Sequence, residues 1–388
     1  MNERNRPEKS KHQSVILSYL KRPAQDRLPY YALIFYLLII ISGILFLLFN
    51  LIPSFADAYN RTVGQFFRML LALLTAWIPF SLSEAILICI PGFLVWAIIH
   101  TMHENLETWK QSLLYTGRIV SFLALILSML ILLFSAGFKG TTLAQKLDYE
   151  TGDTTEAELE STATFLNNRI NELVESGQIG FDESNLSYYE GNWHDLNKTL
   201  LRAYEKASQK YDFIKTFPST LKPIASSPLL TYTHIAGAYT FFTGEVNINY
   251  NFPDYVRVFS SAHEMAHQRG FAREDEANFI AFLVCLESDD PYVTYCGLLN
   301  CYEYVLSALD SESETSSETQ WLLLNDYTKR EMIAYRDFFS KYSGSPVATV
   351  VNSVSQVVQN VSGGKNHSYG VVVDLLVAYH NNLEKGVP

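Results

Sequence analysis

Two histidines and the glutamate between them have the types and the spacing needed for metal-assisted hydrolysis of a peptide bond. His263, Glu264 and His267 form an HExxH pattern. Residues four apart lie on one face of an α-helix, so His263 and His267 can direct two imidazole nitrogens at one zinc ion. Glu264 then projects beside the metal, where it can take a proton from a zinc-bound water and pass it to a leaving amine. The pattern predicts a zinc site with Glu264 as the general base.

Glu274 is the candidate third ligand, because a catalytic zinc needs three protein ligands and one open position. It follows His267 by seven residues, and Gly270 between them can end the first helix in a left-handed cap. A second helix starting near residue 272 would then direct the Glu274 carboxylate at the metal. The alternative for Glu274 is a solvated carboxylate favoured by the helix dipole, and for the histidines it is a role without metal.

Four further side chains flank this candidate site. Asn278 lies one turn beyond Glu274 on the same helix face, where it can hydrogen-bond a ligand histidine. Glu276 points about 200° away from Glu274 and is the less suitable ligand. Arg269 and Arg273 flank the turn, and we expect both to pair with the nearby acids.

The helix and strand patterns in residues 139–388 predict a helix-rich α+β domain, whose elements must position these residues. Thr155 and Glu158 form a capping box at a helix start. Residues 310–319 are acidic and rich in serine, which predicts a solvated loop. Helical periodicity marks residues 155–175, 194–211, 256–287 with a break at Gly270, 293–309, 319–339 and 369–383.

Residues 244–250 alternate between apolar and polar side chains, which predicts a strand shortly before the HExxH helix. A zinc peptidase needs an exposed strand edge beside the metal, because it holds an extended peptide by main-chain hydrogen bonds. This strand is the candidate for that edge. The alternative is an ordinary strand inside a sheet.

The N-terminal third has the composition of a membrane region. The whole chain has a mean hydropathy of +0.05, and residues 1–136 hold only 11 of its 29 Lys and Arg and 7 of its 40 Asp and Glu. Apolar runs long enough to cross the hydrocarbon core occur at about 31–52, 82–102 and 113–138, so residues 31–138 are the predicted transmembrane region. Residues 63–79 are apolar, short and interrupted by Arg68, which predicts an interfacial helix, with a fourth span as the alternative.

Charge predicts the orientation and excludes one class of partner. Seven Lys and Arg lie in the basic tail, residues 1–30, which the positive-inside rule places in the cytoplasm. Three spans then place residues 139–388 outside the cytoplasm of a multi-pass cell-membrane protein, and a fourth span would reverse this. The region from 137 onward holds 18 Lys and Arg against 33 Asp and Glu, which argues against nucleic-acid binding. Cys285, Cys296 and Cys301 are interpreted as buried thiols, although a disulfide remains open.

The run from His263 to Phe282 resembles the signature of a bacterial membrane-protein family known as domain of unknown function 3810. The resemblance extends to residues 77–82, 243–249, 368–370 and 374–376, and departs from the family pattern at 138–142. The HExxH and ExxxN pair also resembles the gluzincins, the thermolysin-like clan of zinc peptidases. That resemblance implies a zincin-like fold, with His263, His267 and Glu274 as zinc ligands, Glu264 as the general base and Asn278 as the partner of a ligand.

Gluzincins usually carry a Tyr or His that stabilises the oxyanion, and His367 and Tyr369 are the candidates in a glycine-rich loop, with plain loop residues as the alternative. The resulting hypothesis is a membrane-anchored, extracytoplasmic zinc metallopeptidase, a hydrolase acting on a peptide or protein substrate beside the lipid bilayer. The rivals are a non-catalytic zinc-dependent sensor or binding domain, and a structural membrane protein with an accidental motif. The sequence does not specify the substrate or the oligomeric state.

Overall fold

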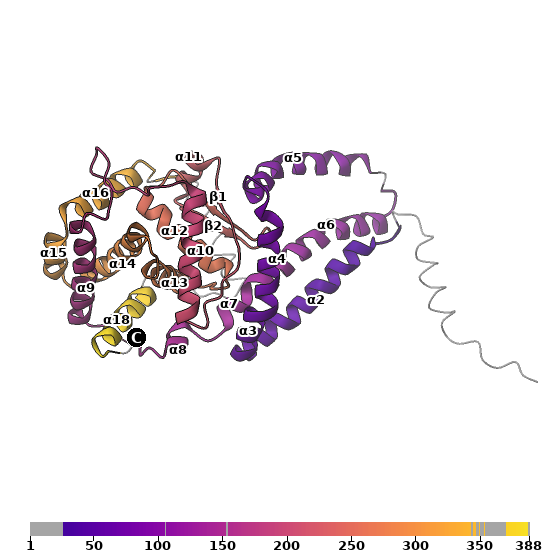
Figure 1. The fold of residues 1–388 in the computed structure, drawn as a ribbon. Helices are drawn as coiled ribbons and strands as arrows, with labels where there is room; N and C mark the ends of the chain where they lie inside the picture. The colour runs from indigo at the N-terminus through magenta and orange to yellow at the C-terminus, as the bar shows by residue number, and fades with distance from the viewer. Residues whose placement is uncertain are drawn as a thin grey trace, which may run out of the picture.

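Three helices at the start of the chain are long and apolar enough to cross a membrane, as the sequence predicts (Figure 1). They are α2 (Tyr30–Leu51), α5 (Leu82–His103) and a continuous helix over Trp109–Lys139. The last is built from α6 (Trp109–Leu130), the π-helical turn η3 (Ile131–Ser135) and α7 (Ala136–Lys139). Helices α2 and α6 lie side by side, whereas α5 stands apart from them (Figure 1).

This computed structural model describes residues 26–104, 106–152, 154–342, 344–346, 349, 353 and 370–386. Two sets of predicted features fall outside these residues: most of the basic tail, and the two oxyanion candidates His367 and Tyr369.

The segment predicted to be interfacial contains a helix, α4 (Gln65–Ala76), which follows α3 (Pro53–Tyr59) and the π-helical turn η2 (Asn60–Gly64). Helix α4 is not among the helices with the length and hydropathy of a span. It runs across the ends of the apolar helices, against the C-terminal region (Figure 1). One face buries Arg68, Ala72 and Thr75, and the opposite face exposes large apolar side chains, which are Phe66, Phe67, Leu70, Leu73 and Leu74. This two-sided character is typical of a helix lying at a membrane surface.

The sheet has three short strands in the order β1-β3-β2. Strand β3 (Glu245–Ile248) pairs in parallel with β1 (Leu221–Pro223) and in antiparallel with β2 (Gly237–Thr240). The strand predicted at residues 244–250 is therefore present as β3, but β3 is central and fully buried, so the alternative of an ordinary strand inside the sheet is confirmed and the edge beside the HExxH helix is β2. The tight turn at Gly244, with φ of +72°, folds β2 back along β3.

Helices enclose this sheet and form the large core of the C-terminal region. Helices α12 (Asp254–Gln268), α13 (Glu274–Leu286) and α14 (Pro291–Glu312) pack on one another, and α9 (Glu156–Glu175) and α18 (Gly370–Glu384) pack on α14. The predicted capping box of Thr155 and Glu158 begins α9 as expected. The predicted buried thiols are also confirmed, because Cys285, Cys296 and Cys301 are free and buried. The remaining elements are α8 (Leu143–Leu147), α10 (Trp193–Lys210), α11 (Ser227–Leu230), η4 (Thr231–Thr233), α15 (Glu314–Leu323) and α16 (Asp326–Ser340).

The predicted loop at 310–319 is wrong, and the helix predicted at 319–339 is two helices. Ser313 caps α15, because its side chain accepts a hydrogen bond from the amide of Ser316. Asn325 caps α16 in the same way. Serine and asparagine satisfy free amides at helix starts, so the polar composition here marks helix boundaries instead of a loop.

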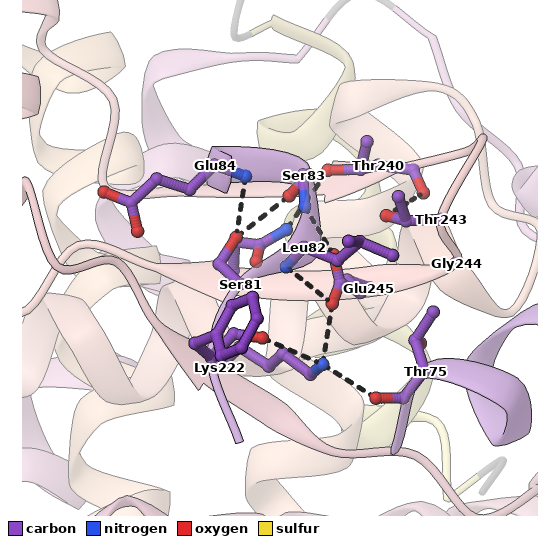
Figure 2. A network of polar contacts seen from close by, with 12 residues as sticks. Thr75, Ser81, Leu82, Ser83, Glu84, Lys222, Thr240, Thr243, Gly244 and Glu245 are labelled. Carbon is purple, nitrogen blue, oxygen red and sulfur yellow. Dashed lines mark hydrogen bonds and ion pairs between the residues drawn. The ribbon is translucent and has the colours of Figure 1, made fainter. Parts of the chain in front are cut away.

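A buried ion pair joins the sheet to the N-terminal helices (Figure 2). The Glu245 carboxylate accepts hydrogen bonds from the amides of Leu82 at 3.0 Å and Ser83 at 2.8 Å, at the start of α5. The Lys222 ammonium lies 2.6 Å from the same carboxylate and donates to the Thr75 carbonyl at 2.8 Å, near the end of α4. Each charge is thus satisfied by backbone groups of the N-terminal helices, which is what makes its burial tolerable.

Arg68 makes a second connection from the buried face of α4. Its guanidinium donates to the carbonyls of Asn60 at 2.8 Å, Leu133 at 3.1 Å and Arg269 at 3.5 Å. These three carbonyls belong to η2, to the third apolar helix and to the turn after α12. The N-terminal helices therefore hold the turn that follows the HExxH motif.

Replacing Glu245 by Gln should lower the free energy of unfolding by about 3–5 kcal/mol, because Lys222 would keep a buried charge without its counterion. Thermal unfolding in detergent measures the effect. The matched control is Glu172→Gln in the exposed Arg169–Glu172 pair, where we expect a change of about 0–1 kcal/mol. Equal losses in the two variants would show that the junction does not depend on this ion pair.

Candidate metal centre

Helix α12 places the two histidines of the motif side by side. It begins after Pro253 and presents His263 and His267 one turn apart, with ring centroids 4.6 Å apart and ring planes nearly perpendicular. The rest of its length is largely buried, since Tyr255, Phe259 and other apolar side chains face the core. A buried helix of this kind holds its functional side chains on a rigid support.

A glycine turn brings Glu274 back to the histidines. Gly270 adopts a φ of +100° directly after α12, and α13 begins at Glu274, as the sequence predicts for this turn. A side chain at Gly270 would also collide with the guanidinium of Arg68. The Glu274 Oε2 atom lies 3.2 Å from Nε2 of His263 and 3.3 Å from Nε2 of His267.

The three candidate ligands fit the geometry of a zinc site. One ligand atom from each of His263, His267 and Glu274 lies within 4.8 Å of the others. Two atoms bound tetrahedrally at about 2.0–2.1 Å from one zinc ion lie about 3.3 Å apart, which matches both distances from the Glu274 carboxylate to the imidazoles. The donor set of two imidazoles and one carboxylate also leaves a fourth position for water.

The Nδ1 atom of His267 donates a hydrogen bond to the Phe271 carbonyl at 2.7 Å. Because a carbonyl only accepts, this bond fixes the proton on Nδ1 and leaves Nε2 facing Glu274. Phe134, in the η3 turn of the third apolar helix, contacts the His267 ring edge to face with centroids 5.9 Å apart. The apolar helix thus forms one wall of the candidate metal centre.

Asn278 does not make the predicted hydrogen bond to a histidine. It lines the same pocket as His263, but within the described part of the chain Nδ1 of His263 is buried without a partner. For His267, the Phe271 carbonyl takes the place that the sequence analysis gave to Asn278. The sequence correctly predicts that Asn278 lies beside the candidate site. It does not predict that the Asn278 side chain makes no hydrogen bond to either histidine.

The sheet edge holds Glu264. The amide of Tyr239 in β2 donates to Oε2 of Glu264 at 2.6 Å, and the side chain is buried. A Cβ atom at Gly237 would lie only 2.8 Å from Cγ of Glu264, so glycine gives the carboxylate the space it needs. Burial raises the pKa of Glu264, although the neighbouring imidazoles favour its charged form.

Burial by itself would lower the pKa of His267, but the Glu274 carboxylate outweighs this effect and raises the pKa to about 9. The same two imidazoles hold the pKa of Glu274 well below its usual range, although the Glu274 side chain is 56% exposed. Charge complementarity therefore holds the three side chains together.

The arginines and Glu276 have structural roles. Arg273 pairs with Glu276 at 2.7 Å, as predicted, and Glu276 also accepts a hydrogen bond from the Leu143 amide at 2.7 Å. Glu276 thus points away from the histidines. Arg269 pairs with no acid among the described residues, which corrects the expectation. Its guanidinium instead lies over the ring of Tyr204, at 4.1 Å from the centroid.

A pocket of about 420 Å³ adjoins the motif. His263, Glu264 and Asn278 line it together with residues of α14 and α16 that the sequence analysis missed, namely Asn300, Glu303, Tyr304 and Tyr335. The spacing of Asn300, Glu303 and Tyr304 places them on one face of α14, which is a signal that the sequence does contain.

Comparison with known protein families gives a match over most of the chain. A family described as "Protein of unknown function (DUF3810)" matches residues 59–377. No curated protein and no solved structure matches the chain.

Proposed function

We propose that this chain, which belongs to the DUF3810 family of proteins of unknown function, is a membrane-anchored zinc metallopeptidase with a gluzincin-like catalytic domain. The observation that carries the proposal is the position of the Glu274 carboxylate between Nε2 of His263 and Nε2 of His267, with Glu264 in the adjoining pocket. The activity is inferred from this chemistry and from the resemblance to gluzincins.

The residues divide into three roles. His263, His267 and Glu274 would hold the metal, and zinc in this donor set supplies polarisation of a carbonyl and activation of a water. Glu264 would take the proton of the attacking water as the C–O bond forms, and would then deliver it to the leaving nitrogen as the C–N bond breaks. Strand β2 offers the edge along which an extended peptide binds, at the point where Tyr239 meets Glu264.

The three apolar helices serve as the anchor in this proposal. They cross the membrane, with the basic N-terminal tail in the cytoplasm and the catalytic domain outside it. Two features support an anchor that is part of the site: Phe134 contacts His267, and Arg68 binds the turn after α12. The exposed apolar face of α4 lies at the membrane surface, so cleavage takes place close to the bilayer.

Glu264→Gln should keep the zinc and lose turnover by about 10²–10⁴-fold or more, since an amide cannot accept the water's proton. Glu274→Gln should instead weaken zinc binding, because a neutral amide replaces an anionic ligand. Zinc content and cleavage of a broad peptide library are measured on both variants and on the wild type.

Loss of zinc in Glu264→Gln with retention in Glu274→Gln would show that the two roles are misassigned. Tight zinc binding by a wild type that cleaves no peptide would favour the non-catalytic sensor. Wild-type protein without zinc would favour a structural protein whose Glu274 merely forms ion pairs with two histidines.

The proposed topology predicts where reporters are active. A periplasmic-type reporter fused after residue 388 should be active, and the same reporter inserted between α5 and α6, after residue 106, should be inactive. The reverse pattern would contradict the proposed orientation and would favour a fourth span at residues 63–79.

A further inference from the structure

The pocket beside the motif contains a half-buried acid that the proposed hydrolysis does not use. Glu303 on α14 accepts a hydrogen bond from the Tyr255 hydroxyl at 2.9 Å, which is a neutral partner. No Lys, Arg or His of the described chain pairs with it. Partial burial raises its pKa to about 7, because no opposite charge nearby in the described part of the molecule stabilises the carboxylate form.

We infer that Glu303 binds a cationic group of the substrate, either a basic side chain or a free amino terminus. This inference rests on the proposed function. An ammonium group donates up to three hydrogen bonds and would give the half-buried carboxylate the opposite charge that it lacks. Tyr304 and Tyr335 line the same pocket, and aromatic rings are favourable neighbours for a cation.

The position of Glu303 agrees with a subsite for a residue near the scissile bond. The pocket extends along α12 from His263 to Val256, seven residues apart, which corresponds to about 10 Å of helix. One residue of an extended peptide spans about 3.3–3.6 Å, so the pocket covers roughly three residues of bound peptide. A cationic group of the substrate bound at Glu303 and the peptide bond to be cleaved would therefore lie in the same pocket.

Asn300 supports the same interpretation because its side chain is already used elsewhere. Its amide nitrogen donates to the carbonyls of Cys296 at 2.8 Å and Tyr255 at 3.3 Å. It therefore fixes the backbone beneath the pocket, and Glu303 is the lining side chain of α14 that carries a charge.

The test measures binding instead of turnover. The protein is full-length, zinc-loaded Glu264→Gln in detergent, and the probes are hexapeptides that carry lysine or norleucine at one scanned position, with a free or an acetylated amino terminus. Calorimetry should show that one cationic probe binds about 10- to 100-fold more tightly than its neutral match. Preference for lysine identifies a basic side chain, and preference for the free terminus identifies an amino-terminal residue.

Adding Glu303→Gln should remove this preference and leave the affinity for neutral probes nearly unchanged. The matched control is Glu312→Gln, an exposed acid at the end of the same helix, which should keep the preference. An equal affinity for cationic and neutral probes in protein with Glu303 intact would overturn the inference, and so would a preference that survives Glu303→Gln. The comparison of cationic with neutral probes uses protein with Glu303 intact, so it does not depend on whether the Glu303→Gln variant folds.

The two proposals fail in distinguishable ways. Cation preference that depends on Glu303, in a protein whose wild type cleaves no peptide, would retain this binding site and reject the peptidase. Cleavage without any cation preference would retain the peptidase and reject this role of Glu303.

Discussion

The buried ion pair between Glu245 and Lys222 is the interaction on which the arrangement of the molecule depends. It satisfies the free amides at the start of α5 from the central strand β3, and a carbonyl at the end of α4 from the neighbouring strand β1. Strand β3 also pairs with β2, whose Tyr239 amide holds Glu264. A continuous path of hydrogen bonds thus connects the apolar helices to the proposed general base.

The candidate metal centre depends on the same junction from its other side. Gly270 allows the chain to turn between the histidines and Glu274, and Arg68 binds the backbone of this turn. Phe134 packs on His267 from a π-helical turn, a distortion that often marks a functional position in a helix. The family match covers residues 59–377, so it includes both halves of this junction. The N-terminal helices are therefore part of the site's construction as well as its proposed anchor.

Sequence reasoning succeeded where one helix or one turn decides the geometry. The spacing of His263 and His267 fixes their common face, and Gly270 fixes the turn that returns Glu274 to them. It failed where packing between distant segments decides. Strand β2 is only four residues long, and its place at the sheet edge depends on the turn at Gly244. The position of Glu303 in the same pocket as His263 depends on how α14 packs against α12, which no local pattern encodes.

The central claim is that His263, His267 and Glu274 hold one zinc ion. X-ray diffraction from zinc-loaded crystals, recorded on both sides of the zinc absorption edge, tests it most directly. The account predicts one anomalous peak about 2.0–2.2 Å from Nε2 of each histidine and from a carboxylate oxygen of Glu274, with a water at the fourth position. A zinc peak bound by other residues, or three side chains that stay within hydrogen-bonding distance with no ion between them, would contradict it.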